Sequence, residues 1–164
     1  MNYFSSAHPS LVIFSSCQNN WPDSNTLDQL VALDKGFNFP WSLDRWKDLD
    51  QQEHFILFLL LESEELTAMG LVYAPNLEQS ELIKLTVQAC YKRQGKGIKL
   101  LENVISYLSS IKAESLFLDV EETNLAALNL YRNLNFNELG VKQNFYGPGR
   151  NGISMRRSID ATQA

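Results

Sequence analysis

The sequence predicts a single α/β domain built on a mixed sheet, and three observations support this fold class. First, short apolar runs of strand length alternate with segments in which apolar residues recur every three to four positions. Second, 45% of the 164 residues are hydrophobic and 20% are charged, which suits one core of ordinary size. Third, no repeat, low-complexity stretch or long Pro/Gly/Ser-rich linker divides the chain. We therefore expect one domain over residues 1–164.

The chain is expected to begin with a strand and two helices. Residues 11–14 are a short apolar run that suits an opening strand. Residues 26–33 place apolar side chains on one helical face behind Ser24, a candidate helix cap. Pro40 interrupts any continuation, so residues 42–49 are expected to form a second, short helix that is capped by its first residue, a serine.

Three strands and a long helix are expected next. The strand-like runs span residues 54–61, 66–74 and 81–87. A polar turn at residues 62–65 suggests that the first two form a hairpin. Beyond Gly97 the pattern changes to a helical period, because one face collects Leu101, Val104, Ile105 and Leu108.

The last third of the chain is expected to add a strand, a helix and two strands. Residues 115–120 suit a short strand, and Thr123 is the candidate cap of the helix that follows. That helix would bury Ala127, Leu130, Tyr131 and Leu134. It would end at Asn135, because asparagine tolerates the left-handed C-terminal conformation. Strands are expected at residues 136–146 and 152–158, around a Gly-Pro-Gly loop, and the whole order of elements predicts a mixed α/β sheet.

The charge and hydropathy of the chain exclude several classes of partner. The 14 Lys and Arg residues are outnumbered by 19 Asp and Glu, which gives a net charge of -5, so we expect no direct nucleic-acid binding. The longest strongly apolar run, residues 55–61, is far shorter than the roughly 20 residues of a membrane-spanning helix, so no membrane span is expected. Residues 1–5 have neither the basic head nor the cleavage site of a targeting peptide, which makes the cytoplasm the expected compartment.

Metal binding and disulfide formation are not expected either. Cys17 and Cys90 are too few for a disulfide framework and lack the short spacing of a metal site, so both are interpreted as reduced packing residues. His8 and His54 are too isolated in the sequence to support catalysis or a zinc site.

The most informative stretch, residues 91–99, lies between a predicted strand and the predicted long helix. Gly95 and Gly97 allow a tight turn and a close approach of the backbone. This turn opens a helix whose first amides are unpaired and whose dipole end is positive. Four cations lie within eight residues, namely Lys92, Arg93, Lys96 and Lys99. The pattern indicates a polyphosphate ligand, whereas the plain alternative is a solvated helix start with ordinary surface lysines.

Motifs on both sides of this turn resemble the GNAT superfamily of acetyl-CoA-dependent N-acetyltransferases. The similarity rests on Arg93-Gln94-Gly95-Lys96-Gly97, on Leu118-Asp119-Val120 followed by Thr123-Asn124, and on Leu130-Tyr131 before Phe136. The sequence is most similar to the bacterial ribosomal-protein-alanine N-acetyltransferases, with which it also shares Phe39-Pro40-Trp41-Ser42 and Asn144-Phe145-Tyr146. The resemblance implies a GNAT fold, a mostly antiparallel central sheet of six to seven strands flanked by about four helices.

The resemblance also assigns residues to acetyl-CoA, the co-substrate. Backbone groups of Leu85, Thr86 and Val87 would hold its pantetheine arm like an added strand. Its pyrophosphate would be received by the amides of Arg93, Gln94, Gly95, Lys96, Gly97 and Ile98. Asn124 would reach the co-substrate as well.

Two catalytic roles follow from the same resemblance. The carboxylate of Asp119 would be the general base, and the hydroxyl of Tyr131 would be the general acid that protonates the departing thiolate. An α-amine has a pKa of about 8 and must lose a proton before it attacks a thioester, whereas a tyrosine with a pKa of about 10 carries its proton at neutral pH. Asp119 stands where the closest family usually has Glu, so a bridging water is the alternative to direct deprotonation. Without the resemblance Tyr131 would be interpreted as a core residue.

Three residues are candidates for the acceptor site, namely Trp41, Glu121 and Tyr146. Trp41 either lines a peptide groove formed by the loop between the first two helices or plugs the core. Glu121 stands where the family has Arg, and the acidic group that it forms with Asp119 and Glu122 would suit a cationic peptide or would simply solvate a strand end. Around Tyr146, an open groove would accept a peptide and a closed pocket would accept a small amine.

Three functions are compatible with these residues. We expect an enzyme that moves acetyl from acetyl-CoA directly to the N-terminal α-amine of a protein, and the resemblance favours the N-terminal alanine of a small-subunit ribosomal protein. The alternatives are an acetyltransferase of a small amine, such as a polyamine or an aminoglycoside, and a non-catalytic acyl-CoA-binding module. The enzyme is expected to need no metal and to be a monomer or a weak dimer.

Overall fold

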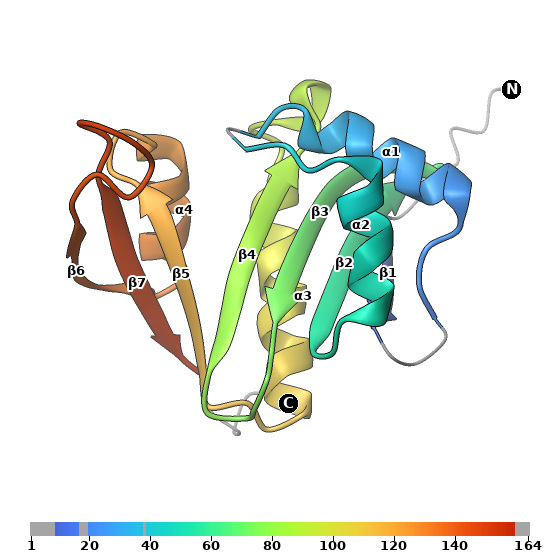
Figure 1. Cartoon of the computed structure of the whole chain (residues 1–164). Helices are drawn as coiled ribbons and strands as arrows, with labels where there is room; N and C mark the ends of the chain where they lie inside the picture. The colour runs from blue at the N-terminus through green and yellow to red at the C-terminus, as the bar shows by residue number, and fades with distance from the viewer. Residues whose placement is uncertain (1–8, 17–19, 38, 160–164) are drawn as a thin grey trace, which may run out of the picture.

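The chain folds around one seven-stranded sheet with the strand order β1-β2-β3-β4-β5-β7-β6 (Figure 1). The structure, a computed structural model, describes residues 9–16, 20–37 and 39–159. Its strands are β1 (Ser10–Ser15), β2 (Phe55–Glu62), β3 (Glu65–Tyr73), β4 (Ser80–Val87), β5 (Ser115–Glu121), β6 (Asn137–Lys142) and β7 (Gly152–Ser158). Within the described residues four α-helices accompany the sheet: α1 (Ser24–Asp34), α2 (Leu43–Asp48), α3 (Lys96–Ser110) and α4 (Leu125–Asn133). Two short 3-10 helices, η1 (Leu49–Gln51) and η2 (Ala89–Tyr91), follow α2 and β4.

Neighbouring strands run antiparallel except at the centre of the sheet. There β4 and β5 are parallel, and α3 provides the crossover between them. All other pairs of the described strands are antiparallel. A mostly antiparallel sheet of seven strands with four α-helices confirms the fold class expected from the sequence.

The helices cover both faces of the sheet and produce two cores (Figure 1). The apolar stripe of α3 and the buried side of α4 pack on one face, together with Phe58 of β2. The other face carries α1 and α2 over a cluster that includes Leu57, Leu59 and the fully buried Trp46. Successive side chains of a strand point to opposite faces, so the near-continuous apolar run of β2 can fill both cores.

The parallel pair β4 and β5 is joined at one end only. Its registered pairs are Ser80 with Leu116 and Glu81 with Phe117, and beyond them the two strands diverge (Figure 1). The α1–α2 loop, the loop before α3 and the β6–β7 loop all lie at the wide end of this opening (Figure 1). The fold therefore gathers three loops from distant parts of the sequence around one gap in the sheet.

Two helix caps differ from the sequence expectation by one position. Asp23, not Ser24, caps α1, because its Oδ1 accepts a hydrogen bond from the amide three residues later at 2.8 Å. Asn124, not Thr123, caps α4 in the same way at 3.2 Å. Ser42 caps α2 as expected. Adjacent polar residues compete for the cap, and only the backbone conformation at each position decides between them.

Other expectations are corrected at strand ends and at one cysteine. The strand expected at residues 136–146 is shorter, because β6 ends at Lys142 and a turn follows. Asn135 has a φ of 60° and ends α4 as expected. Cys90 is exposed, so it is not a packing residue, whereas Cys17 and His8 lie outside the described residues. No helix in the described part of the chain has the length and apolar character needed to cross a membrane.

Candidate active site

The loop before α3 presents a row of unpaired backbone amides. Arg93 and Gly95 have φ values of 61° and 74°, so the backbone passes twice through the left-handed region before the helix begins. In the described part of the chain, no acceptor is found for the amides of residues 93–98. Successive amides in such a turn, at the positive end of a helix, form a concave site for an anion. The loop thus has the geometry expected for a pyrophosphate site.

The four cations of this loop divide into one paired and three unpaired side chains. Lys96 Nζ lies 2.7 Å from Oε2 of Glu62, the last residue of β2, which holds the lysine in an ion pair. Lys92, Arg93 and Lys99 are exposed and have no ion-pair partner among the residues that the structure describes. Three positive charges therefore remain available to phosphate groups.

The two glycines of the loop have different surroundings. Gly95 has a positive φ and no other atom within 4 Å of where a Cβ would be, so its backbone conformation is what requires glycine. A Cβ at Gly97 would lie 3.5 Å from Val87 and 3.6 Å from Leu130. Both distances are ordinary contacts and the φ of Gly97 is not positive, so a small side chain would fit at this position.

The inner edge of β4 leads from this loop into the opening. Leu85, Thr86 and Val87 pair with β3 on one side, while no described strand pairs with them on the other. Their outward backbone groups can therefore bond to an extended ligand that adds as a strand. The Thr86 hydroxyl is buried and has no hydrogen-bond partner within the described ranges, so a polar ligand would satisfy it. These features fit the pantetheine arm of acetyl-CoA.

Asp119, the expected base, lies on β5 with its carboxylate already engaged. Lys142 Nζ, at the end of β6, is 2.7 Å from Oδ2, and the Ser154 hydroxyl donates to Oδ1. The strand register places these residues side by side: Ser154 is directly opposite Asp119, and Lys142 is opposite Gly152, two positions before Ser154 on β7. The Asp119 side chain is 13% exposed, whereas that of Lys142 is 48% exposed, so the ion pair joins a largely buried carboxylate to a solvent-accessible ammonium group.

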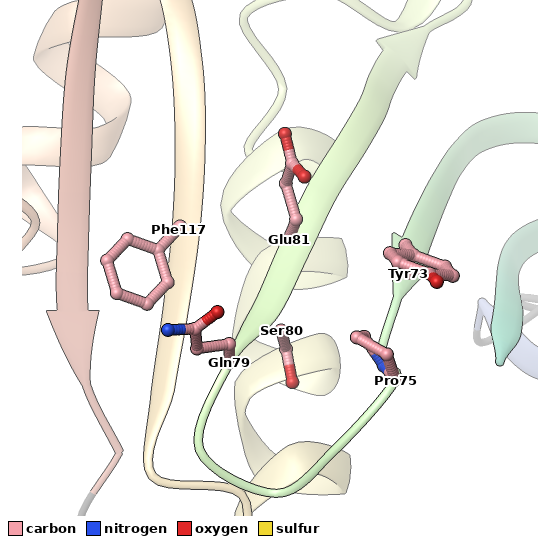
Figure 2. A pocket seen from close by; sticks show the side chains of 6 residues that line it. All are labelled: Tyr73, Pro75, Gln79, Ser80, Glu81 and Phe117. Atoms are coloured by element: carbon pink, nitrogen blue, oxygen red, sulfur yellow. The ribbon is translucent and has the colours of Figure 1, made fainter.

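A second carboxylate, Glu81, stands on β4 at the narrow end of the opening and was not among the expected site residues. Burial raises the pKa of Glu81, the charge of Asp119 raises it further, and Lys142 lowers it. Figure 2 shows its side chain pointing up the opening, beside a cavity of about 240 Å³ that is lined by Tyr73, Pro75, Gln79, Ser80, Glu81 and Phe117. The sequence signal that could have indicated Glu81 is a charged residue at the first position of the predicted strand 81–87.

Two tyrosines with raised pKa values belong to the same region. Tyr131 of α4 is 7% exposed, and burial raises the pKa of its hydroxyl well above the usual value, with Tyr146 adding to the effect. The hydroxyl of Tyr131 has no hydrogen-bond partner among the described residues. Burial, with Asp119 and Glu121 nearby, raises the pKa of Tyr146 to about 12, and its hydroxyl donates to the Asp119 carbonyl oxygen at 2.9 Å. Both hydroxyls therefore keep their protons at neutral pH, and that of Tyr131 is available to donate.

The residues expected to bind the acceptor have different surroundings. Glu121 accepts hydrogen bonds of 2.7 and 2.8 Å from the Arg150 guanidinium, which compensates its charge. Trp41 is half-buried and packs on Trp46 with ring centroids 5.2 Å apart, against the core under α1 and α2. Phe39, to which the sequence assigned no role, is the residue of that loop that reaches the ring of Tyr146.

Asn124 lies at the start of α4, where its Oδ1 is engaged as the helix cap. The Asn124 side chain is exposed, and its Nδ2 can donate to another partner. As for metals, the described residues contain no group of three or more His, Cys, Asp or Glu side chains arranged to hold an ion.

Comparisons with known proteins point to one family. Residues 20–136 match the acetyltransferase (GNAT) family. The ribosomal protein bS18-alanine N-acetyltransferase of Escherichia coli strain K12 is 33% identical over 131 residues, which are 74% of this chain and 87% of that protein. The crystal structure of the ribosomal-protein-S18-alanine N-acetyltransferase from Escherichia coli superposes with a TM-score of 0.77 at 27% identity, covering 92% of this chain and 95% of the other. An aminoglycoside 6'-N-acetyltransferase in complex with coenzyme A has a TM-score of 0.75 at 16% identity, covering 91% of this chain and 97% of the other, and shares the fold.

Proposed function

The chain belongs to the acetyltransferase (GNAT) family, and from that premise we propose that this acetyl-CoA-dependent enzyme acetylates the α-amine at the N-terminus of a protein. The proposed acceptor is the N-terminal alanine of a small-subunit ribosomal protein. The observation that carries the proposal is the 33% identity, over 74% of the chain, to an enzyme named for that reaction. Because ribosomal proteins are made in the cytoplasm, the same proposal assigns the enzyme to that compartment.

The co-substrate would bind along the free edge of β4 and the loop before α3. Acetyl-CoA supplies an acetyl group that is activated as a thioester. The outward backbone groups of Leu85, Thr86 and Val87 would hold its extended arm, and the amides of residues 93–98 would receive its pyrophosphate. Asn124 would reach it from the start of α4. The unsatisfied Thr86 hydroxyl and the unpaired amide row support this assignment.

The acceptor amine would enter beside two carboxylates and one unpaired hydroxyl. Asp119 would remove the proton of the ammonium group, directly or through water, after the amine displaces Lys142 from its carboxylate. Glu81, at the narrow end of the opening, adds negative charge that favours a cationic acceptor. Tyr131 would give its proton to the departing thiolate, a role supported by its raised pKa and unpaired hydroxyl.

Mass spectrometry of four acceptors tests the proposal. The enzyme would be incubated with acetyl-CoA and a peptide that begins with free Ala, the same peptide with a blocked N-terminus, a blocked peptide with an internal lysine, and a polyamine. We expect one added acetyl group on the free N-terminus alone. A Tyr131→Phe variant is the matched control, because it should bind acetyl-CoA and transfer slowly.

Other results of the acceptor assay would change the proposed acceptor. Transfer to the polyamine alone would replace the protein acceptor by a small amine while keeping the enzyme class. Transfer to the internal lysine at the same rate as to the α-amine would remove the N-terminal specificity. Replacing the peptide's first residue by leucine tests the alanine preference, since equal rates for Ala and Leu would contradict it.

A further inference from the structure

One buried ion pair in the chain connects the α1–α2 loop to the strand that borders the opening. Asp34, the last residue of α1, is fully buried, and Lys84 of β4 is 2% exposed. Their charged groups meet at 2.8 Å between Asp34 Oδ1 and Lys84 Nζ. Removing two charges from water costs free energy that their attraction alone does not reliably recover, so such a pair is weak grounds for a stabilising role. A geometric role explains it better.

The α1–α2 loop, residues 35–37 and 39–42, is folded around this pair. Lys84 Nζ donates to the Phe39 carbonyl oxygen at 2.9 Å, and Asp34 Oδ2 accepts from the Trp41 amide at 2.7 Å. The ammonium group also lies 4.3 Å from the ring centroid of Phe37 and 4.7 Å from that of Trp41. Each charged group thus holds a backbone group of the loop in addition to its partner.

Beyond this anchor the loop reaches the opposite side of the opening. The ring of Phe39 stacks on Tyr146 of the β6–β7 loop at 6.2 Å between centroids, and the Arg150 guanidinium lies 5.9 Å from the same ring. The Tyr146 hydroxyl in turn donates to the Asp119 carbonyl oxygen. A chain of contacts therefore runs from Lys84 on β4, through Phe39 and Tyr146, to β5. It crosses the gap where the two strands are not paired.

We propose that Asp34 and Lys84 are positioning residues that hold Phe39 against Tyr146 and thereby determine how tightly the acceptor binds. The effect is specific to the acceptor side, because the amide row of residues 93–98 makes none of these contacts. The acceptor part of the inference rests on the proposed function. The contact between the two loops does not depend on the proposed function, so the positioning role and the proposed function can be contradicted separately.

The test compares charge removal at the pair with charge removal elsewhere. Lys84→Met alone would leave the Asp34 carboxylate buried without a cation and could unfold the chain. The main variant is therefore the double change Asp34→Asn and Lys84→Met, which removes both charges together. The matched control is Arg132→Met with Glu138→Gln, an exposed pair at 2.6 Å between α4 and β6, away from both loops. Phe39→Ala removes the ring that joins the α1–α2 loop to Tyr146.

Steady-state kinetics and hydrogen exchange give independent results. We expect the double variant to raise the acceptor KM about tenfold and to leave the acetyl-CoA Kd unchanged, because misplacing a positioning group weakens binding without touching the co-substrate. Adding Phe39→Ala should raise KM by less than the product of the separate effects, since both act through one contact. Amide hydrogen exchange should accelerate in the α1–α2 loop and in residues 143–151, and the control pair should change neither result.

An acceptor KM and exchange rates that match the wild type in a folded double variant would overturn the proposal. So would an equal loss of acetyl-CoA affinity, which would indicate a general defect of the opening. If the wild type transfers acetyl only to a polyamine, the kinetics are repeated with that acceptor. If it transfers to none, faster exchange in both loops still supports the positioning role, and unchanged exchange contradicts it.

Discussion

Tyr131 has a combination of properties that a purely structural tyrosine does not need. Its ring packs on Phe136 with centroids 5.6 Å apart, as a core residue would, yet its hydroxyl is left without a partner among the described residues. The ring is buried, but the hydroxyl oxygen is not among the buried polar atoms that lack a partner in the described residues, so it reaches solvent-accessible surface. A hydroxyl that is accessible and bonded to no described acceptor can donate a proton to a departing thiolate, which supports the catalytic interpretation.

We predict that Tyr131→Phe lowers kcat by about a hundredfold or more, the range for loss of a general acid. The acetyl-CoA Kd should not change. The melting temperature should not fall either, because the change removes a hydroxyl that has no partner among the described residues. Since burial raises the pKa of Tyr131, the wild-type kcat should show no decline from its ionisation up to about pH 10. Single-turnover kinetics and calorimetry measure these values, and an unchanged kcat would end the assignment.

Two matched variants distinguish the roles of the two carboxylates beside the opening, Asp119 and Glu81. We predict that Asp119→Asn lowers kcat/KM, most strongly below about pH 8, where an α-amine is mainly protonated and needs a base. Glu81→Gln should have the smaller effect on rate. The Glu81→Gln change should not lower the free energy of unfolding at neutral pH. The pKa of Glu81 is raised in the folded protein, so folding disfavours the ionised carboxylate, and the wild type loses stability as the pH rises through that pKa. A larger kcat/KM loss in Glu81→Gln would transfer the role of base to β4.

The catalytic assignments of Asp119 and Tyr131 stay predictions, and the structure adds contacts of these residues that the sequence did not predict. Asp119 and Tyr131 follow from local motifs, which need no knowledge of the fold. The ion pair between Asp119 and Lys142 spans 23 positions and depends on the register of three strands. Glu81 was missed for the same reason, since only the parallel pairing of β4 with β5 brings it near Asp119.

Helix α3 and its preceding loop form the element on which the proposed co-substrate binding depends. The pattern of glycines and cations predicted the turn and the helix after it, but it could not distinguish the surroundings of the two glycines or reveal the ion pair of Lys96 with Glu62. These features depend on how α3 packs against β4, α4 and the end of β2. The cap errors at Ser24 and Thr123 have a similar origin, because adjacent polar residues have nearly equal cap preferences.

The two glycine positions lead to different predictions for the same substitution. Gly95→Ala should lower the free energy of unfolding by about 1 kcal/mol, because a side chain is strained at a φ of 74°, and it should weaken acetyl-CoA binding. Gly97→Ala should change the free energy of unfolding little, since its Cβ would make ordinary contacts of 3.5 and 3.6 Å. Urea denaturation and calorimetric titration with acetyl-CoA test both. Equal effects at the two positions would contradict the distinction.

On the scale of the whole molecule, the sheet consists of two parts joined by a short parallel pairing. Strands β1 to β4 form one part and β5, β7 and β6 the other, and only two registered residue pairs connect them. The order of elements predicted the strands and the mixed sheet, but the divergence of β4 and β5 is a property of long-range pairing that no local pattern contains. The expected monomer or weak dimer stays a prediction.

This architecture predicts that acetyl-CoA stabilises the whole protein. A ligand that adds along β4 and caps the amide row would supply contacts where the two parts of the sheet lack pairing. At a concentration about 100 times its Kd, such a ligand adds about 2.7 kcal/mol to the free energy of unfolding. For a chain of this size that corresponds to a rise of about 5–10 °C in melting temperature. Differential scanning calorimetry with increasing acetyl-CoA measures the shift. Gly95→Ala should need more ligand for the same shift, whereas Arg132→Met with Glu138→Gln should match the wild type. A melting temperature that does not respond to acetyl-CoA would mean that the opening is not its binding site.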